Sequence, residues 1–295
     1  MPGETTTSAL ADSLSTVRAS ARMVQEQKGD MRSTVDQRVL GKNIGNTWSE
    51  VDYAKLTAST VTETTDNIDS PEQIADDLIS ISPTDSGIHI LYTDRVADRI
   101  LADGASIIRS GALGMRAILR KNNIDGITQG RSATTDMGTA GNPLTSTLVR
   151  HASYRISSNT TEPGTGALHM QHHGFCLADI DDELTSAVGT YEITTGVTAD
   201  IFANSFAKAP RTLGSVMVHE NGDMSIDSSN DSEGFVYTSD GIIEIEGRGV
   251  RTEVKRRPNI GGGATSLFMY FEYAWGFRSS GNWCFSITAD ATAPA

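Results

Sequence analysis

The first 39 residues of this chain contain too few apolar side chains to form a core of their own. They are rich in Thr, Ser, Asp, Arg and Gln, and the apolar residues form only a weak helical stripe: Leu10, Leu14, Val17, Met23 and Val24. A polar segment of this kind cannot bury enough surface to fix its own conformation. We therefore expect an arm that is held in place by something else, most simply by neighbouring copies of the chain.

The next segments have the composition of extended strands. Residues 46–65, NTWSEVDYAKLTASTVTETT, are dense in Thr, Val and aromatic residues with frequent alternation, which predicts two strands or one long hairpin. A two-stranded hairpin is only marginally stable in water, so this one should lie across another surface. Residues 78–92, LISISPTDSGIHILY, predict two further strands around a PTDSG turn.

The pattern then changes to that of a helix. After Thr93 and Asp94, the stretch VADRILADGASIIRSGALGMRAILRKNNIDGI has the strongest helical pattern of the chain. Its apolar stripe consists of Ile107, Ile108, Gly111, Ala112, Met115, Ile118 and Leu119. At about 100° per residue, Arg109, Arg116 and Arg120 lie within about 40° of one another, opposite that stripe. They form a solvated face, which is the simpler interpretation, or a basic stripe that faces nucleic acid.

The second half of the chain first alternates helices and strands and then becomes mostly strands. A flexible loop, TQGRSATTDMGTAGNP, precedes a helix predicted from Leu144 to about Ser157. A short strand, ALHMQH, leads into a helix that starts near Gly174. The last third predicts strands from SVMVHENGDMSID to NWCFSIT. The aromatic strand around Phe268 to Trp275 alternates poorly and should be buried on both sides or at an interface.

Charge and cysteine content exclude several classes of protein. Acidic residues outnumber basic ones by 37 to 24, and the net charge of −13 disfavours sequence-specific DNA binding while keeping the chain soluble. Cys176 and Cys284 have no CxxC spacing, so we expect neither a disulfide framework nor a zinc ribbon. No run of about 18 apolar residues and no secretion signal is visible, and we expect no membrane partner.

The stretch HMQHHGFC is the strongest candidate for a metal site. His169, His172, His173 and Cys176 carry suitable atoms, but neither HExxH nor paired CxxC is present. In a strand, His169 and His173 share a face and His172 points away; in a helix, His172 and Cys176 share one instead. Either geometry unites at most two ligands, so imidazoles bonded to backbone or water are the simpler interpretation.

Other catalytic motifs are incomplete. The chain has no GxSxG elbow, and NIGGGATSL lacks the GK[ST] ending of a phosphate-binding loop. EGRGVR has two of the three glycines of a dinucleotide loop, so both glycine stretches predict turns. The acidic group DIDDEL lacks the ligand spacing of an EF-hand loop. We predict no enzyme and no cofactor.

The order of these parts resembles the major capsid proteins of tailed phages, which have the Hong Kong 97 fold. The stretches that carry the resemblance are VTETTDNIDSPEQIADDLISISPTDSGIHILYTDRVADRI, HHGFCLADIDDELT, GFVYTSDGIIEIEGRGVRTEVKRR and NWCFSITADATAPA. The resemblance implies an α+β fold with an N-terminal arm at 1–39, an extended E-loop hairpin at 40–72 and a peripheral domain with a long spine helix at 73–142. An axial α/β domain at 143–234 follows, and 235–295 returns to the peripheral domain and ends in a tail.

The same resemblance implies a structural role. Copies would assemble into hexamers and pentamers of an icosahedral virion capsid around double-stranded DNA, after synthesis in the host cytoplasm. A portal, and possible separate scaffold and decoration proteins, would be the other partners. We expect Trp48, Tyr53 and Leu56 to contact adjacent subunits, and Arg109, Arg116 and Arg120 to face the lumen. An encapsulin-like compartment shell, a metal-dependent hydrolase using His169, His172 and His173, and a β-rich tail module are the alternatives.

Overall fold

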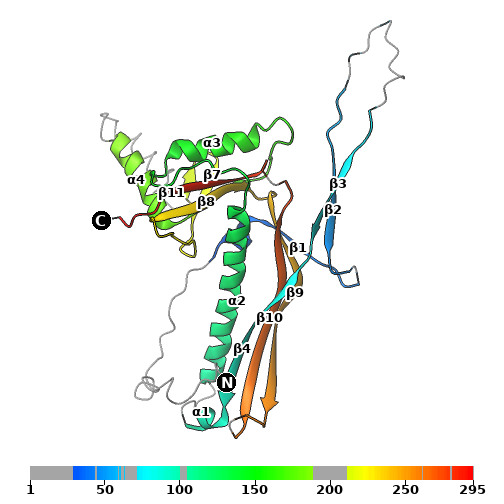
Figure 1. Ribbon diagram of the computed structural model, residues 1–295, viewed down its shortest axis with the longest axis vertical. Coiled ribbons are helices and arrows are strands. Elements are labelled where there is room, and N and C mark those ends of the chain that lie inside the picture. Colours follow the sequence, from blue (N-terminus) through cyan, green and yellow to red (C-terminus); the bar gives the residue numbers. More distant parts are fainter. Residues whose placement is uncertain are drawn as a thin grey trace.

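A computed structural model describes residues 29–43, 45–58, 60, 63, 72–99, 105–188, 211–260, 262–279 and 281–294 (Figure 1). Most of the predicted arm, residues 1–28, therefore lies outside the described residues. The described residues mix helices and strands, as the sequence predicts, and the strands among them form two larger sheets and one separate hairpin. Among the described residues, no helix is long and apolar enough to cross a membrane.

The first sheet is a long ribbon of four strands in the order β1-β9-β10-β4. It consists of β1 (Asp36–Val39), β9 (Ile242–Arg257), β10 (Ala264–Phe277) and β4 (Thr84–Thr93). β10 pairs antiparallel with both β9 and β4, whereas β1 pairs parallel with the upper part of β9 only. Consequently β9 has no strand neighbour on its other edge along most of its length, as far as the described residues reach.

Helix α2 (Ala105–Arg131) runs along one face of this ribbon, after the short α1 (Asp94–Arg99) (Figure 1). The predicted helix is confirmed, but only part of its predicted apolar stripe meets the sheet: Ile118 and Gly111 do, whereas Met115 and Leu119 are exposed. Gly114, which was not in the predicted stripe, also faces the sheet, and an added Cβ there would lie 2.8 Å from the Met269 sulfur. Glycine permits this close approach of helix and sheet.

The aromatic strand β10 is not buried on both sides, contrary to one of the predicted alternatives. Met269, Phe271 and Tyr273 are buried under α2, whereas Phe268 and Tyr270 on the opposite face are only partly covered. The aromatic residues therefore alternate between a core face and an outer face. The sequence obscured this alternation because both faces carry aromatic side chains.

The second sheet has five strands in the order β11-β8-β5-β7-β6. They are β11 (Cys284–Asp290), β8 (Asp231–Thr238), β5 (Leu168–His172), β7 (Val216–Glu220) and β6 (Arg211–Leu213). Helices α3 (Ser146–Ser157) and α4 (Gly174–Val188) share an apolar core with one face of the sheet. The predicted helix near 144–157, the strand ALHMQH and the helix start near Gly174 are all confirmed. β11 lies here, although its residues fall in the range predicted to return to the peripheral domain.

The hairpin pairs β2 (Trp48–Tyr53) with β3 (Asp76–Ile81) in antiparallel register and projects away from both sheets (Figure 1). The prediction of a hairpin within residues 46–65 is therefore wrong, because the partner strand lies beyond residue 75. Only Ser82 and Pro83 separate β3 from β4, so the predicted PTDSG turn is absent there and the chain continues directly into the ribbon.

The last residues of the predicted arm are built into the fold. The 3₁₀ helix η2 (Met31–Thr34) places Met31 in a core with Ile127, Phe235 and Ile242. Arg32 forms ion pairs with Glu244 and Glu246, and the Thr34 hydroxyl bonds to the Tyr237 hydroxyl. This segment covers the face of the five-stranded sheet opposite to α3 and α4.

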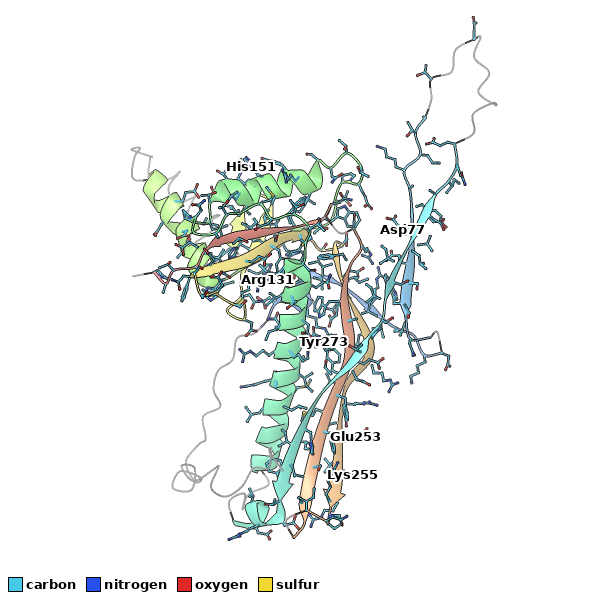
Figure 2. The ribbon with its side chains drawn as sticks, viewed as in Figure 1. Asp77, Arg131, His151, Glu253, Lys255 and Tyr273 are labelled. Atoms are coloured by element: carbon cyan, nitrogen blue, oxygen red, sulfur yellow. The ribbon has the colours of Figure 1, made fainter. Side chains whose placement is uncertain are left out.

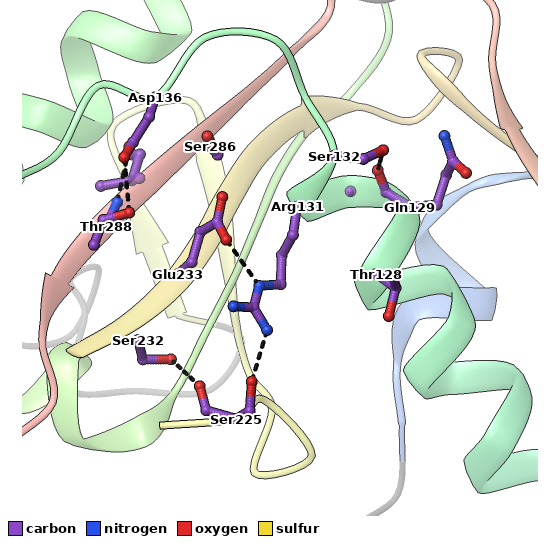
Figure 3. Close-up of polar contacts among 12 residues, drawn as sticks. Thr128, Gln129, Arg131, Ser132, Asp136, Ser225, Ser232, Glu233, Ser286 and Thr288 are labelled. Atoms are coloured by element: carbon purple, nitrogen blue, oxygen red, sulfur yellow. Dashed lines mark hydrogen bonds and ion pairs between the residues drawn. The ribbon is translucent and has the colours of Figure 1, made fainter. Parts of the chain in front are cut away.

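The Gly/Thr-rich stretch TQGRSATTDMGTAGNP, predicted to be a flexible loop, makes several contacts with the rest of the fold. Its first residues belong to α2, which ends at Arg131, and Arg131 contacts Glu233 and Ser225 (Figure 3). The Asp136 carboxylate then accepts hydrogen bonds from the backbone N–H and hydroxyl of Thr288 (Figure 3). These contacts tie the segment to the edge of the five-stranded sheet.

Candidate functional site

The three histidines of HMQHHGFC point to three different partners. His169 and His219 approach each other with 3.1 Å between Nδ1 and Nε2, and burial together with the neighbouring His219 lowers the pKa of His169 to about 4. His172 is fully buried on the other face of the sheet, where its Nε2 lies 3.2 Å from the Ile287 carbonyl and its Nδ1 accepts from the His173 N–H. Both of its nitrogens are thus occupied in the neutral form.

The third histidine caps a helix. The Nδ1 atom of His173 accepts a hydrogen bond from the Phe175 N–H at 3.2 Å, at the start of α4. Cys176 is buried in the core beneath, and burial raises the pKa of its thiol to about 12. The three imidazoles therefore do not converge, and the described residues contain no group of three His, Cys, Asp or Glu that could hold a metal. This geometry argues against the hydrolase alternative.

The acidic run DIDDEL organises the start of α3. The Glu183 carboxylate accepts from both the backbone N–H and the hydroxyl of Ser146, and the Asp179 carboxylate accepts from the Leu144 N–H. Carboxylates at a helix N-terminus satisfy free N–H groups and favour the helix dipole. The run is therefore a helix cap rather than only a solvated face. Of the two glycine stretches predicted to form turns, NIGGGATSL has Gly262 and Gly263 between β9 and β10 and its last four residues in β10, but EGRGVR lies within β9.

The β2–β3 hairpin is mostly exposed. Tyr53 is 68% exposed, Leu56 is 52% exposed and Leu78 is 59% exposed. Trp48, in contrast, lies at the root and packs against Ile243 and Ile245 of its own chain. Of the three predicted contact residues, Tyr53 and Leu56 thus remain available to a partner, whereas Trp48 already has one within its own subunit.

The hairpin and the lower half of β9 carry opposite charge. Residues 50–77 contain eight acidic residues and one lysine, whereas residues 248–257 contain five basic residues and one glutamate. Asp77 lies on the hairpin, and Glu253 and Lys255 lie near the far end of the ribbon (Figure 2). The two regions are well separated within one copy, so they cannot neutralise each other there.

The outer face of the ribbon combines aromatic rings with arginines. His89 stacks on Phe268 with ring centroids 4.3 Å apart and planes 6° from parallel. Arg257 lies over the Phe268 ring and Arg251 over the Tyr270 ring, at 5.6 Å and 5.0 Å from the centroids. A half-covered surface of flat rings and cations suits an acidic, partly apolar partner.

In the predicted arginine stripe on α2, Arg120 has a structural role. Arg120 forms an ion pair with Asp223, with 3.0 Å between Nε and Oδ1, and the Asp223 side chain is only 2% exposed. Arg120 therefore neutralises a carboxylate that the fold has removed from water. Arg116 is exposed, and the side chain of Arg109 lies outside the described residues.

Two further arginines were missed by the sequence reasoning. Arg32 joins η2 to β9 through Glu244 and Glu246, and Arg278 joins β1 to β2 through Asp36 and Glu50. No local motif marks them, because each partner lies in a segment distant in sequence.

Comparisons of the sequence find no relative. No protein-family model matches the chain, and no curated protein is a significant match.

Comparisons of the structure find many similar chains. The head structure of Helicobacter pylori bacteriophage KHP40 matches with a TM-score of 0.71 at 10% identity, covering 92% of this chain and 94% of that one. The capsid of cyanophage P-SCSP1u matches with a TM-score of 0.68 at 8% identity, covering 93% and 92%. The SrpI encapsulin of Synechococcus elongatus matches with a TM-score of 0.64 at 9% identity, covering 95% and 96%. The chain therefore has the fold of these shell proteins, and the Hong Kong 97-like fold predicted from the sequence is confirmed.

Proposed function

We propose that this chain is the major capsid protein of a tailed phage, a structural and non-enzymatic subunit of an icosahedral head. The observation that carries the proposal is the match to phage capsid chains over nearly the whole length of both partners. The exposed apolar residues of the hairpin support it independently, because a hairpin that covers no core of its own needs a second surface.

In the proposed shell, the acidic hairpin of one copy lies on the basic part of β9 of the next. Such a contact joins two different patches, so it is heterologous, and repetition around an axis closes it into a ring. Tyr53 and Leu56 would be covered in the contact while Lys255 and Arg257 meet the carboxylates. Individually weak contacts of this kind gain strength because each copy makes several at once. Pentamers and hexamers of the chain, a portal, and any scaffold or decoration proteins complete the proposed assembly in the host cytoplasm.

The packaged DNA would meet the chain through positive charge alone. Arg109, Arg116 and Arg120 form the proposed lumen-facing stripe on α2. Arg120 already pairs with Asp223, so part of its charge is neutralised within the folded chain.

An encapsulin-like compartment shell is the second candidate, favoured by the match to the SrpI encapsulin. Both candidates require a closed shell built from one kind of chain, and the fold alone does not separate them. The contents of the particle do: a phage head encloses DNA, whereas a compartment encloses protein cargo.

Electron microscopy of the purified full-length chain tests the proposal. We expect closed, uniform shells, and we expect their yield to fall as salt is raised, because screening weakens the contact between the acidic hairpin and the basic strand. A monomer that persists at high concentration across salt and pH would contradict the proposal. Expression beside the neighbouring genes of the source genome, followed by analysis of nucleic acid and protein inside the particles, then separates the two candidates.

A further inference from the structure

Among the described residues, the side-chain packing between the hairpin and the rest of the chain lies at its root. Ile81 at the end of β3 lies against Gly276, where an added Cβ would approach an Ile81 methyl carbon at 2.4 Å. Trp48 and Ile79 complete a small apolar cluster with Ile243 and Ile245. Beyond this cluster the hairpin is exposed on both faces, so its direction depends on few contacts.

Arg278 adds a polar clamp at this root. Its Nη2 atom lies 2.6 Å from Asp36 Oδ2 on β1, and its Nε atom lies 2.9 Å from Glu50 Oε2 on β2. Its Nη1 and backbone N–H donate to the carbonyls of Asp240 and Gly241, in the turn between β8 and β9. The Arg278 side chain is only 13% exposed, so its guanidinium is largely shielded from solvent, although Glu50 is 40% exposed. One guanidinium thus connects the hairpin, the edge of the ribbon and the turn that joins the two sheets.

A small change of angle at the root becomes a large displacement further out. A strand rises about 3.3 Å per residue, so the end of β2 lies roughly 15–20 Å from Trp48, and a rotation of about 10° moves that end by about 3 Å. A gap of about 0.5–1 Å already removes about a quarter to a half of the dispersion attraction between packed atoms. A hairpin that packs against another surface therefore needs a fixed direction before the contact forms.

We propose that Arg278 is a positioning residue for assembly: it holds the β2–β3 hairpin at the angle at which its acidic, apolar surface meets the next copy. This inference rests on the proposed shell function for its consequence, but the clamp itself is a property of the single subunit. The planar guanidinium can satisfy two carboxylates and a carbonyl in fixed directions, which a flexible ammonium group cannot.

The test compares Arg278→Met with Arg248→Met. Arg248 forms an ion pair of similar length with Glu272 on the same ribbon, but it is exposed and does not touch the hairpin. Spin labels at Leu78→Cys and His151→Cys, on the hairpin and on α3, report the direction of the hairpin by double electron–electron resonance. Cys176 and Cys284 are buried, and burial raises the pKa of both thiols, so neither should take up the label.

We expect one narrow distance distribution for the parent and for Arg248→Met, and a clearly broader or shifted one for Arg278→Met. The distance distribution of Arg278→Lys should be intermediate in width between those of the parent and Arg278→Met. In assembly assays we expect Arg278→Met to lower shell yield by about tenfold or more, because every copy then lacks both ion pairs of Arg278, including the one that holds the hairpin, and to produce irregular particles. Urea denaturation should show that the variant remains folded; if it does not, Glu50→Gln removes only the hairpin side of the clamp and replaces it in the test.

An unchanged distance distribution in folded Arg278→Met or Glu50→Gln would overturn the inference. A broadened distribution with shells of parental yield and size would also overturn the assembly role. If the parent forms no shells at all, the proposed function fails, while the spectroscopic comparison still decides whether Arg278 directs the hairpin.

Discussion

The five-stranded sheet and the β2–β3 hairpin differ in where their side chains find partners. In the sheet, α3 and α4 cover one face while η2 and the end of α2 cover the other, so Met170 and Phe235 are both fully buried. In the hairpin, Tyr53 and Leu78 are more than half exposed. The sheet is therefore stabilised within one chain, whereas the hairpin gains little free energy until another surface covers it.

The largest effect on the single subunit should come from removing residues 1–35. This truncation deletes Met31 from the core and leaves Glu244, whose pKa burial already raises, without Arg32. We expect the free energy of unfolding to fall by about 5 kcal/mol or more, enough to unfold an ordinary domain. Urea denaturation followed by circular dichroism measures the loss.

The matched control is removal of residues 1–28, which spares η2 and all its contacts. Its free energy of unfolding should fall less than that of the 1–35 truncation, while its assembly tests the arm separately. Equal stability of the two truncations would show that η2 is not part of the core.

The next largest effect on the free energy of unfolding should come from replacing a buried aromatic residue of the sheet, in contrast to an exposed one of the hairpin. Phe235→Ala creates a cavity in the core beside Gly130 and should lower the free energy of unfolding by about 3–5 kcal/mol. Tyr53→Ala on the hairpin removes an exposed ring and should change it by less than about 0.5 kcal/mol. Similar losses for both variants, measured by urea denaturation of unassembled subunits, would remove the distinction between the two regions.

A third expected effect is a loss of stability at low pH, and it arises from His172 in the five-stranded sheet. Burial lowers the pKa of His172 to about 4, below the ordinary 6.5, so the unfolded chain binds a proton at pH values where the folded chain does not. The stability contributed by neutral His172 is therefore complete above about pH 6.5 and falls as pH decreases towards 4, by about 3 kcal/mol.

His172→Asn should remove this pH-dependent loss of stability, because an amide oxygen can accept a hydrogen bond from the His173 N–H without titrating. The free energy of unfolding, measured at about pH 7 and about pH 4, should then decrease less in the variant than in the parent. The free energy of unfolding should still decrease with pH in both proteins, since burial also lowers the pKa of His169, His173 and His219. Equal declines for parent and variant would place His172 outside the acid response.

Local sequence patterns predicted the elements whose structure depends on residues close together in sequence. The helical period of α2 and α3 and the strand-to-helix junction at His172 were all readable, and alternation of side chains already indicated that the three histidines do not converge. The resemblance in the order of parts led to the fold that the structural matches confirm.

Pairing between distant segments was not readable. The sequence could not reveal that β2 pairs with β3 across the intervening loop, or that β11 joins the five-stranded sheet, because strand propensity does not specify the partner. The charge partners of Arg278 and Arg120 were missed for the same reason. The face of α2 that meets the sheet was predicted only in part, because Gly114, which adds no hydrophobicity to a pattern, makes one of the close contacts with the sheet.

The smallest effect on the single subunit should accompany a large effect on assembly. The double variant Tyr53→Ser, Leu56→Ser should leave the free energy of unfolding within about 0.5 kcal/mol of the parent, because both side chains are already exposed. Each copy nevertheless loses apolar area at every interface that it makes, so shell yield should fall steeply. Tyr154→Ser on α3 is the matched control, since that ring is comparably exposed but lies outside the hairpin. Light scattering and electron microscopy measure the yield, and an equal fall for the control would mean that the hairpin is not the surface that needs a second copy.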